Sequence, residues 1–174
     1  MRLFVAVPVP GELREKLAAL CGEIRADGLV PVKPENMHLT LKFIGEADES
    51  GAGKIEEKLR AISFAPFRCS LRGVGVFPDE HHIRVVWAGC ESGGALEKLA
   101  KDVMDALSGY GDDKPFSAHL TIARVKRKLD LKGFLQKHRD EPFGEFEAKE
   151  FHLIKSELKP GGPEYSALAR FGTD

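Results

Sequence analysis

The sequence has few of the features that stabilise secreted proteins or anchor membrane proteins. It contains three cysteines in 174 residues, Cys21, Cys69 and Cys90, and no two of them form a CxxC pair. A sparse, odd-numbered set of this kind is typical of free thiols in a reducing compartment. The apolar N-terminal stretch meets charge by Glu12, which makes it too short for a signal peptide or a membrane span. We therefore expect a cytoplasmic protein with no membrane contact.

Neither sign of charge is in excess. The chain has 26 lysines and arginines against 27 aspartates and glutamates, and its sequence pI is about 6.6. A domain that coats nucleic acid is normally strongly basic, so this balance excludes a general coat and restricts any nucleic-acid role to a local site. The composition is otherwise that of an ordinary globular protein, and a chain of this length buries roughly 70% of its unfolded surface without disulfides or metals.

Hydrophobic periodicity predicts short strands alternating with amphipathic helices. Short β-prone segments bounded by turn residues predict strands over residues 4–7, 37–44, 67–77, 83–88, 118–125, 146–156 and 165–171. Apolar residues at three- and four-residue steps predict helices over residues 11–27, 53–62, 95–107 and 131–138.

Two of these segments recur at one offset. Residues 4–7 (Phe-Val-Ala-Val) lie 81 residues before residues 85–88 (Val-Val-Trp-Ala), and residues 38–41 (His-Leu-Thr-Leu) lie the same distance before residues 119–122 (His-Leu-Thr-Ile). A repeat at a fixed offset is a stronger indication of fold than the propensity of any one segment. It predicts two β-α-β-α-β units in tandem, each with a His-x-Thr on its second strand.

A pair of histidines in equivalent positions suits phosphodiester chemistry. Residues at i and i+2 of a strand share a face, so His38 points the same way as Thr40, and His119 the same way as Thr121. A pseudo-twofold arrangement would face the two imidazoles across one cleft. Imidazole titrates near pH 6.5, so one ring can accept a proton while the other donates one. The threonine hydroxyls can bind the non-bridging phosphate oxygens.

The motifs resemble those of a known family. Residues 4–8 (Phe-Val-Ala-Val-Pro), 38–45 (His-Leu-Thr-Leu-Lys-Phe-Ile-Gly) and 119–124 (His-Leu-Thr-Ile-Ala-Arg) look like the LigT-like 2′-5′ RNA ligase / RNA 2′,3′-cyclic phosphodiesterase family, part of the two-histidine (2H) phosphoesterase superfamily. The C-terminal residues 155–158, 162–165 and 168 match its usual ending.

This resemblance implies an α+β fold in one bilobal domain, residues 1–174. Two pseudosymmetric lobes, roughly 1–80 and 81–174, would carry mainly antiparallel sheets around a central cleft, with the last strand a candidate to cross between them. It also implies His38 and His119 as the acid–base pair, and phosphate contacts from Thr40, Thr121 and Arg124. In an ideal strand Arg124 has the opposite parity to His119, so it reaches the cleft only through a bulge, a twist or the strand end.

Several further residues are candidate contacts to RNA, and each also has a structural interpretation. Lys126 and Arg127 follow the second motif and either contact an RNA strand leaving the cleft or form a solvated loop. Lys42 shares the parity of His38 and is a candidate RNA contact, or else a lysine that reaches water. We expect three aromatic residues, Phe43, Phe77 and Trp87, to pack in the core rather than to stack on a base. No metal site or cofactor is expected.

The expected function is metal-independent hydrolysis of 2′,3′-cyclic phosphates, at RNA ends or in cyclic nucleotides, to 2′-phosphates. Two alternatives remain open: reversible 2′-5′ ligation of RNA halves by the same histidines, and a non-catalytic module that binds RNA ends or nucleotides. The expected partner is RNA with a 2′,3′-cyclic phosphate terminus or a 2′,3′-cyclic nucleotide. A monomer suffices for one site, and no obligatory protein partner is expected.

Overall fold

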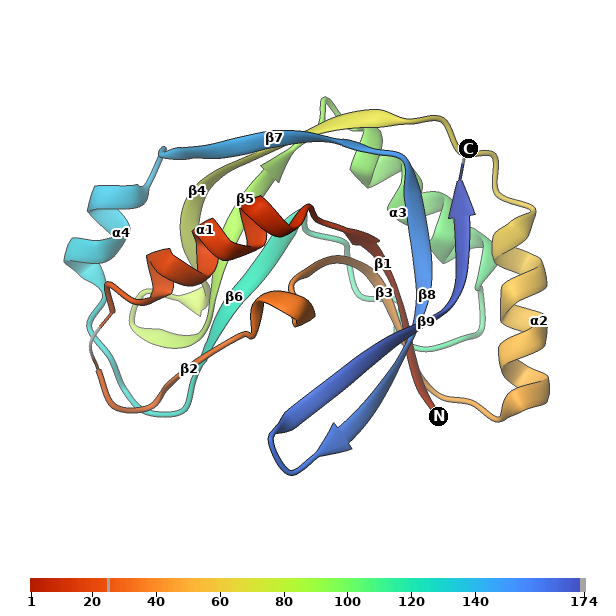
Figure 1. The fold of residues 1–174 in the computed structure, drawn as a ribbon, viewed down its shortest axis with the longest axis horizontal. Coiled ribbons are helices and arrows are strands. Elements are labelled where there is room, and N and C mark those ends of the chain that lie inside the picture. Colours follow the sequence, from red (N-terminus) through yellow and green to blue (C-terminus); the bar gives the residue numbers. More distant parts are fainter. Residues whose placement is uncertain (25, 173–174) are drawn as a thin grey trace.

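The protein consists of two antiparallel sheets with helices packed on them (Figure 1). The structure, a computed structural model, describes residues 1–24 and 26–172. The strands are β1 (Arg2–Pro8), β2 (Leu29–Pro31), β3 (His38–Glu46), β4 (Phe67–Asp79), β5 (His82–Glu91), β6 (His119–Val125), β7 (Pro142–Ala148), β8 (Glu150–Lys159) and β9 (Gly162–Gly172). The helices are α1 (Gly11–Cys21), α2 (Glu49–Arg60), α3 (Ala95–Ala106), α4 (Lys132–His138) and the short 3-10 helix η1 (Pro34–Asn36).

The first sheet has the strand order β3-β1-β8-β9 and the second β2-β6-β5-β4-β7. Every pair of neighbouring strands in them is antiparallel. The series β3-β1-β8-β9 corresponds to β6-β5-β4-β7, so the two sheets are equivalent. The predicted α+β class, with two pseudosymmetric antiparallel halves, is confirmed.

The sheets do not follow the expected division of the chain at residue 80. The third strand of each repeat lies in the other repeat's sheet: β4 pairs with β5, and β8 pairs with β1. A tight turn joins β4 to β5, and such sequential strands usually pair. The last strand, β9, pairs with β8 and so lies in the sheet of the N-terminal repeat.

Two predicted boundaries are wrong. The helix predicted over residues 11–27 ends at Cys21, and residues 29–31 form strand β2 against β6. The single strand predicted over residues 146–156 is two strands, β7 and β8, separated at Lys149 and placed in different sheets. Local alternation of apolar residues does not reveal which partner a strand pairs with, because that choice depends on segments far apart in the sequence.

Two of the helices also pack against strands from the other half of the chain. Helix α1 follows β1 but packs against β6 and β7, whereas α3 follows β5 but packs against β3. Helices α2 and α3 lie together at one end of the molecule, with α1 and α4 at the other (Figure 1). The buried apolar residues on the helix-covered faces form one main cluster that runs through both halves.

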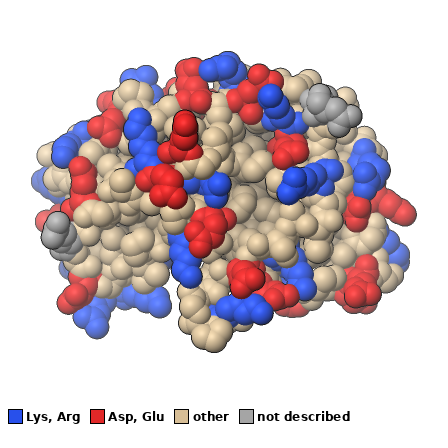
Figure 2. Space-filling view, in the orientation of Figure 1, with Lys and Arg blue, Asp and Glu red and all other residues tan. Residues whose placement is uncertain are grey.

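The surface in Figure 2 carries acidic and basic side chains side by side, with no large area of one sign on the face shown. None of the helices in residues 1–24 and 26–172 has the length and apolar character needed to cross a bilayer.

Candidate active site

The two histidine strands lie close together at the junction of the sheets. β3 is an edge strand of the first sheet, and it contacts β6 of the second. The chain also links them directly, because β2 pairs with β6 and leads through η1 into β3. Just after β2, the amide of Val32 donates a hydrogen bond to the Ile122 carbonyl, with 2.9 Å between N and O. The two His-x-Thr motifs therefore stand on neighbouring strands.

Both motifs contain the same backbone irregularity. In the first, Thr40 pairs with Ala6 and Lys42 with Val5, which leaves Leu41 as an extra residue. In the second, Thr121 pairs with Trp87 and Ala123 with Val86, so Ile122 is extra. Such a β-bulge reverses the alternation of the side chains that follow it. Leu41 and Ile122 lie 81 residues apart, so the repeat extends to the register of the strands.

The second bulge places Arg124 on the same face as His119 and Thr121. Residues 38–44 and 119–125 share one burial pattern, in which the first and third residues are half-buried and the sixth is exposed. The sixth residue is Phe43 in the first motif and Arg124 in the second. No ion pair joins Arg124 to any carboxylate in residues 1–24 or 26–172.

Both histidines are held in the same tautomer. Nδ1 of His38 lies 3.2 Å from the carbonyl oxygen of Asn36, and Nδ1 of His119 lies 2.8 Å from that of Ser117. A carbonyl only accepts hydrogen bonds, so each Nδ1 carries the proton and the neutral ring keeps its lone pair on Nε2. Asn36 and Ser117 are themselves 81 residues apart. Each Nε2 is thus a proton acceptor when the ring is neutral and a donor when it is protonated.

Aromatic rings flank each imidazole. His38 lies 6.3 Å from Phe4 and 5.8 Å from Tyr165 between ring centroids. His119 lies 5.0 Å from Phe77, edge to face, and 6.4 Å from Trp87. These rings remove water from the imidazoles, which disfavours the charged form.

Burial lowers the pKa of both histidines below the ordinary value of 6.5. For His38, electrostatic effects of His152 and Arg14 lower the pKa further, and the hydrogen bond to Asn36 opposes these effects. For His119, the Arg124 guanidinium adds to the lowering and the bond to Ser117 opposes it. Lowered pKa values favour the neutral imidazole at pH 7, in which Nε2 is free to accept a proton.

The structure contradicts the expectation that Lys42 contacts RNA. Its side chain is buried, and Nζ donates a hydrogen bond to the carbonyl of Asp112 at 2.7 Å, with the Asp113 carboxylate 3.8 Å away. The bulge at Leu41 is the reason, because it turns Lys42 onto the helix-covered face with Val5. Lys42 therefore ties the loop that precedes β6 to β3.

The three aromatic residues expected in the core do not behave alike. Phe43 is 61% exposed, because the bulge that buries Lys42 turns the next side chain outward. Trp87 and Phe77 are half-buried beside His119. Trp87 lies flat over Gly75, its partner on β4, and a Cβ at that position would overlap the indole ring.

Other expected residues lie around the two motifs. The side chains of Thr40 and Thr121 are half-buried, and neither hydroxyl hydrogen-bonds to another residue within the part of the chain that the structure describes. Lys126 and Arg127 are exposed just beyond β6, where the Lys126 amide bonds to the Gly28 carbonyl. Among the described residues, no group of three or more His, Cys, Asp or Glu side chains is arranged to hold a metal ion.

Sequence reasoning missed two supporting residues. Asn36 orients His38 through its carbonyl, and its side-chain amide donates to the Pro163 carbonyl of β9 at 2.9 Å. Cys21 donates from its thiol to the carbonyl of the bulge residue Ile122 at 3.3 Å. The fixed offset could have identified Asn36, since it lies two residues before His38 as Ser117 does before His119. Nothing in the sequence marks Cys21.

Comparisons with known proteins agree with this arrangement. The family model described as LigT like phosphoesterase matches residues 7–87 and 90–165. An RNA 2′,3′-cyclic phosphodiesterase of Archaeoglobus fulgidus is 44% identical over 98% of this chain and 99% of its own, and one of Methanocaldococcus jannaschii is 38% identical over 97% and 98%.

Solved structures agree as well. A crystal structure of a Thermus thermophilus protein superposes with a TM-score of 0.83 at 37% identity, covering 99% of this chain and 97% of that one. Escherichia coli LigT complexed with 3′-AMP gives a TM-score of 0.82 at 26% identity, covering 98% and 97%. With its paired His-x-Thr strands and a match over nearly its whole length, this chain belongs to the LigT-like phosphoesterase family.

Proposed function

We propose that this protein hydrolyses the 2′,3′-cyclic phosphate of an RNA end, or of a cyclic nucleotide, to a 2′-phosphate, with His38 and His119 as the acid–base pair. The observation that carries this proposal is the matched pair of imidazoles, each with Nδ1 held by a backbone carbonyl and Nε2 available. A binding module would need no such pair of Nε2 atoms, whereas an acid–base catalyst needs one nitrogen to accept a proton and another to donate one.

The reaction proceeds by two proton transfers. One neutral imidazole accepts a proton through Nε2 from a water molecule as the water oxygen attacks phosphorus. The P–O3′ bond breaks, and the protonated imidazole donates its Nε2 proton to O3′, which leaves as a hydroxyl. The phosphate stays on O2′, and one water is consumed. Each positioned proton transfer typically contributes ~10²–10⁴-fold to the rate.

Three side chains bind the phosphate in this proposal. The hydroxyls of Thr40 and Thr121 donate to the non-bridging oxygens, one from each strand. Arg124, free of carboxylate partners among the described residues, adds a charge-assisted bond from the second strand. Charge that builds on phosphorus is stabilised by donors already in position, which costs no reorganisation during the reaction.

The relatives support the substrate class. The proteins of A. fulgidus and M. jannaschii are named RNA 2′,3′-cyclic phosphodiesterases, and E. coli LigT has been crystallised with 3′-AMP. We extend this class to the present chain, with the exposed Lys126 and Arg127 as contacts to the phosphates of an RNA strand that leaves the site. Both motifs come from one chain, so we expect a monomer of 19.1 kDa to be active.

Phosphorus NMR of the product tests the proposal. The protein is incubated with an oligonucleotide ending in a 2′,3′-cyclic phosphate, in excess EDTA because the proposed steps need no metal. The expected product is a 2′-phosphomonoester. An unchanged cyclic phosphate across neutral pH, with the oligonucleotide bound, would identify a binding module instead. A 3′-phosphate product would place the departing oxygen at O2′ and contradict the proposed bond cleavage.

A further inference from the structure

The short turn that precedes His38 is tied to its surroundings at both ends. This turn, η1, ends with Asn36, whose carbonyl accepts a hydrogen bond from Nδ1 of His38 at 3.2 Å. At its start, Nη1 of Arg14 on α1 donates to the Pro34 carbonyl at 3.1 Å. At its end, the side-chain amide of Asn36 donates to the Pro163 carbonyl of β9 at 2.9 Å. The carbonyl that fixes the His38 tautomer therefore belongs to a turn held by two side-chain hydrogen bonds.

On its own, η1 is a weak support. Two backbone hydrogen bonds close the turn, from the Asn36 amide to the Lys33 carbonyl at 2.8 Å and from the Met37 amide to the Pro34 carbonyl at 3.1 Å. Short 3-10 turns have poorer hydrogen-bond geometry than α-helices, and the three residues of η1 are half-buried or exposed. We therefore expect the position of the Asn36 carbonyl to depend on the side chains that hold the turn from outside.

Arg14 has no counterion to explain its position. It is half-buried at the end of the first turn of α1, and its Nε is buried without a hydrogen-bond partner in the described part of the chain. Within residues 1–24 and 26–172 no carboxylate forms an ion pair with it. Removing a cation from water without a counterion costs free energy, which the bond to the Pro34 carbonyl partly offsets. The guanidinium thus stabilises the turn rather than a carboxylate.

We propose that Arg14 is a positioning residue for catalysis, which holds η1 so that Asn36 keeps His38 in the tautomer with the proton on Nδ1 and the lone pair on Nε2. This inference rests on the proposed function, because it assigns a support to one member of the same acid–base pair. A neutral imidazole in the other tautomer presents an N–H at Nε2, so it cannot accept a proton there. Arg14 acts through the turn and contacts no atom of the substrate.

The loop before His119 is held in a comparable way by a different residue. There the Lys42 ammonium donates to the Asp112 carbonyl at 2.7 Å. A cationic side chain therefore ties the segment before each histidine strand to the rest of the fold. The two supports do not follow the 81-residue repeat, since the residue 81 positions after Arg14 is Ala95. Each support can thus be removed separately, and loss of the Arg14 bond should leave His119 unchanged.

The ¹⁵N NMR signals of the histidine rings report the tautomer without requiring turnover. At about pH 8, above the ordinary histidine pKa, wild-type His38 should carry its proton on Nδ1. Arg14→Met keeps an apolar stem but removes the donor, and we expect a mixture of both tautomers at His38 with His119 unchanged. Arg14→Lys keeps a charged donor and should retain most of the wild-type tautomer. Should Arg14→Met fail to fold, Arg14→Gln takes its place with the same expected signals.

Steady-state kinetics on a 2′,3′-cyclic nucleotide measure the consequence for the proposed reaction. A misplacement of roughly 1 Å in a catalytic group can cost ~10²-fold in rate, and we expect Arg14→Met to lower kcat by about tenfold. KM should be nearly unchanged, because Arg14 does not contact the substrate. Arg14→Lys should restore most of kcat. A kcat that Arg14→Lys restores without restoring the tautomer would contradict the proposed route through η1.

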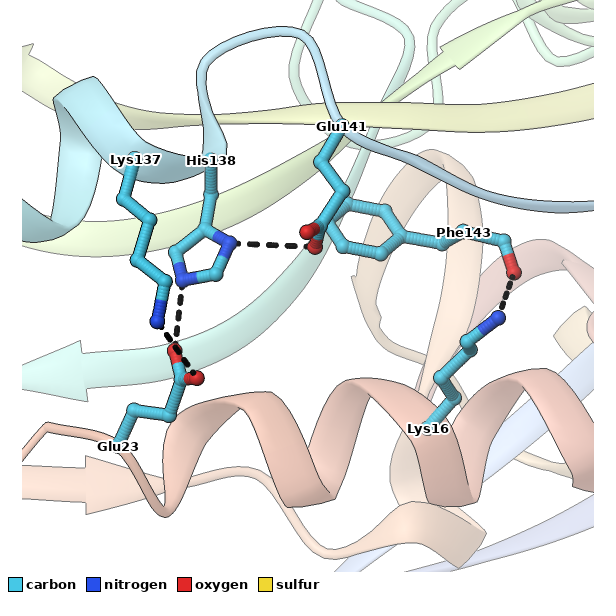
Figure 3. Close-up of polar contacts among 6 residues, drawn as sticks. All are labelled: Lys16, Glu23, Lys137, His138, Glu141 and Phe143. Atoms are coloured by element: carbon cyan, nitrogen blue, oxygen red, sulfur yellow. Dashed lines mark hydrogen bonds and ion pairs between the residues drawn. The ribbon is translucent and has the colours of Figure 1, made fainter.

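Lys16→Met is a matched control on the same helix. Lys16 lies two residues beyond Arg14, and its Nζ donates to the Phe143 carbonyl at 3.1 Å, so it ties α1 to β7 by a bond of the same length (Figure 3). This variant should show the wild-type His38 tautomer and the wild-type kcat. Equal changes at His38 in Arg14→Met and Lys16→Met would indicate a general loosening of α1 and overturn the positioning role.

The tautomer measurement separates this inference from the proposed function. A wild-type tautomer at His38 in Arg14→Met would show that the positioning role is wrong, even where hydrolysis is confirmed. Equal changes at His38 and His119 would also overturn it, because the effect would not be local to η1. A selective change at His38, in a protein whose wild type hydrolyses no cyclic phosphate, would support the role of Arg14 in holding the ring and refute the proposed enzyme.

Discussion

The thiol of Cys21 on α1 donates a hydrogen bond to the carbonyl of Ile122, the bulge residue of β6, with 3.3 Å between Sγ and O. Burial raises the pKa of this thiol to about 11, so it keeps its proton at neutral pH. Together with the Val32 amide, it satisfies the carbonyl of the extra residue in the bulge. A conformation that turns Arg124 toward His119 is therefore stabilised from the opposite side of the sheet.

Replacing Arg124 tests whether its side chain contacts the phosphate of the substrate. Arg124→Gln removes the proposed charge-assisted contact to the phosphate, and a hydrogen bond to a charged group is worth about 1.5–3 kcal/mol. We expect kcat/KM to fall by roughly 10- to 150-fold on a 2′,3′-cyclic nucleotide, with Arg124→Lys intermediate because lysine lacks the planar fork. Unchanged kinetics in steady-state assays of Arg124→Gln would show that the side chain points to solvent.

The pH dependence follows from the lowered pKa values of His38 and His119. The proposed mechanism needs one neutral and one protonated imidazole, so kcat/KM, which reports the free enzyme, should be highest below pH 6.5. A bound phosphate anion favours the imidazolium, so the alkaline limb of kcat should lie at higher pH than that of kcat/KM.

Histidine NMR titration of Arg124→Gln provides an internal control for that pH dependence. Removing the cation should raise the pKa of His119 toward 6.5 and leave that of His38 unchanged, since Arg124 contributes only to the His119 shift. Equal shifts of both histidines would contradict this assignment.

Much of the site followed from the 81-residue offset, whereas the way the halves assemble did not. The offset predicted the two motif strands, and placed the two histidines in equivalent positions. The exchange of β4 and β8 between sheets depends on pairing between segments far apart in the chain, which no local pattern records. The break at Lys149 was hidden for the same reason, because the residues on both sides of it are strand-forming.

The bulges explain the remaining differences. Strict alternation placed Lys42 beside His38 and expected Phe43 in the core, and both predictions were wrong because Leu41 is an extra residue in β3. Alternation likewise left Arg124 facing the cleft only through a bulge, a twist or the strand end, and a bulge is present at Ile122. Neither Leu41 nor Ile122 is a glycine, so nothing in their identity signals an irregular strand.

Variants of Lys42 and Lys126 separate a structural role from a role in RNA binding. Lys42→Met keeps the apolar stem but removes the hydrogen bond from the buried ammonium to the Asp112 carbonyl, and a hydrogen bond to a charged group contributes about 1.5–3 kcal/mol. We expect a lower midpoint of thermal unfolding, with the salt dependence of RNA binding unchanged. Lys126→Ala should do the reverse: equal stability, weaker RNA binding and a shallower salt dependence. Loss of stability in Lys126→Ala alone would contradict both assignments.

His138, the last residue of α4, lies between two carboxylates (Figure 3): that of Glu23, just beyond the end of α1, and that of Glu141, just before β7. Its Nε2 lies 2.6 Å from Glu23 and its Nδ1 3.1 Å from Glu141, so both bonds form only when both ring nitrogens carry protons. The hydrogen bond from His138, with Lys137 nearby, holds the pKa of Glu23 below its ordinary value of 4.5. A lowered carboxylate pKa stabilises the fold above the unfolded pKa, and that stabilisation is lost as the pH falls through the folded value.

Urea unfolding of Glu23→Gln from pH 3 to pH 6 measures this contribution. The variant should be less stable than the wild type above about pH 4.5, and the difference should disappear toward pH 3. A difference that stays constant across this range would show that Glu23 acts through packing rather than through its charge.

The most direct test of the two-histidine account is the single-turnover rate of cyclic-phosphate hydrolysis, in EDTA, for His38→Gln, His119→Gln and the double variant. Groups that act as one catalytic unit are strongly non-additive. We expect each single variant to lose at least ~10²-fold in rate, and the double variant to be scarcely slower than either. If the double variant loses rate by the product of the two single-variant losses, the histidines act independently. A near-wild-type rate in either single variant would contradict the acid–base pair.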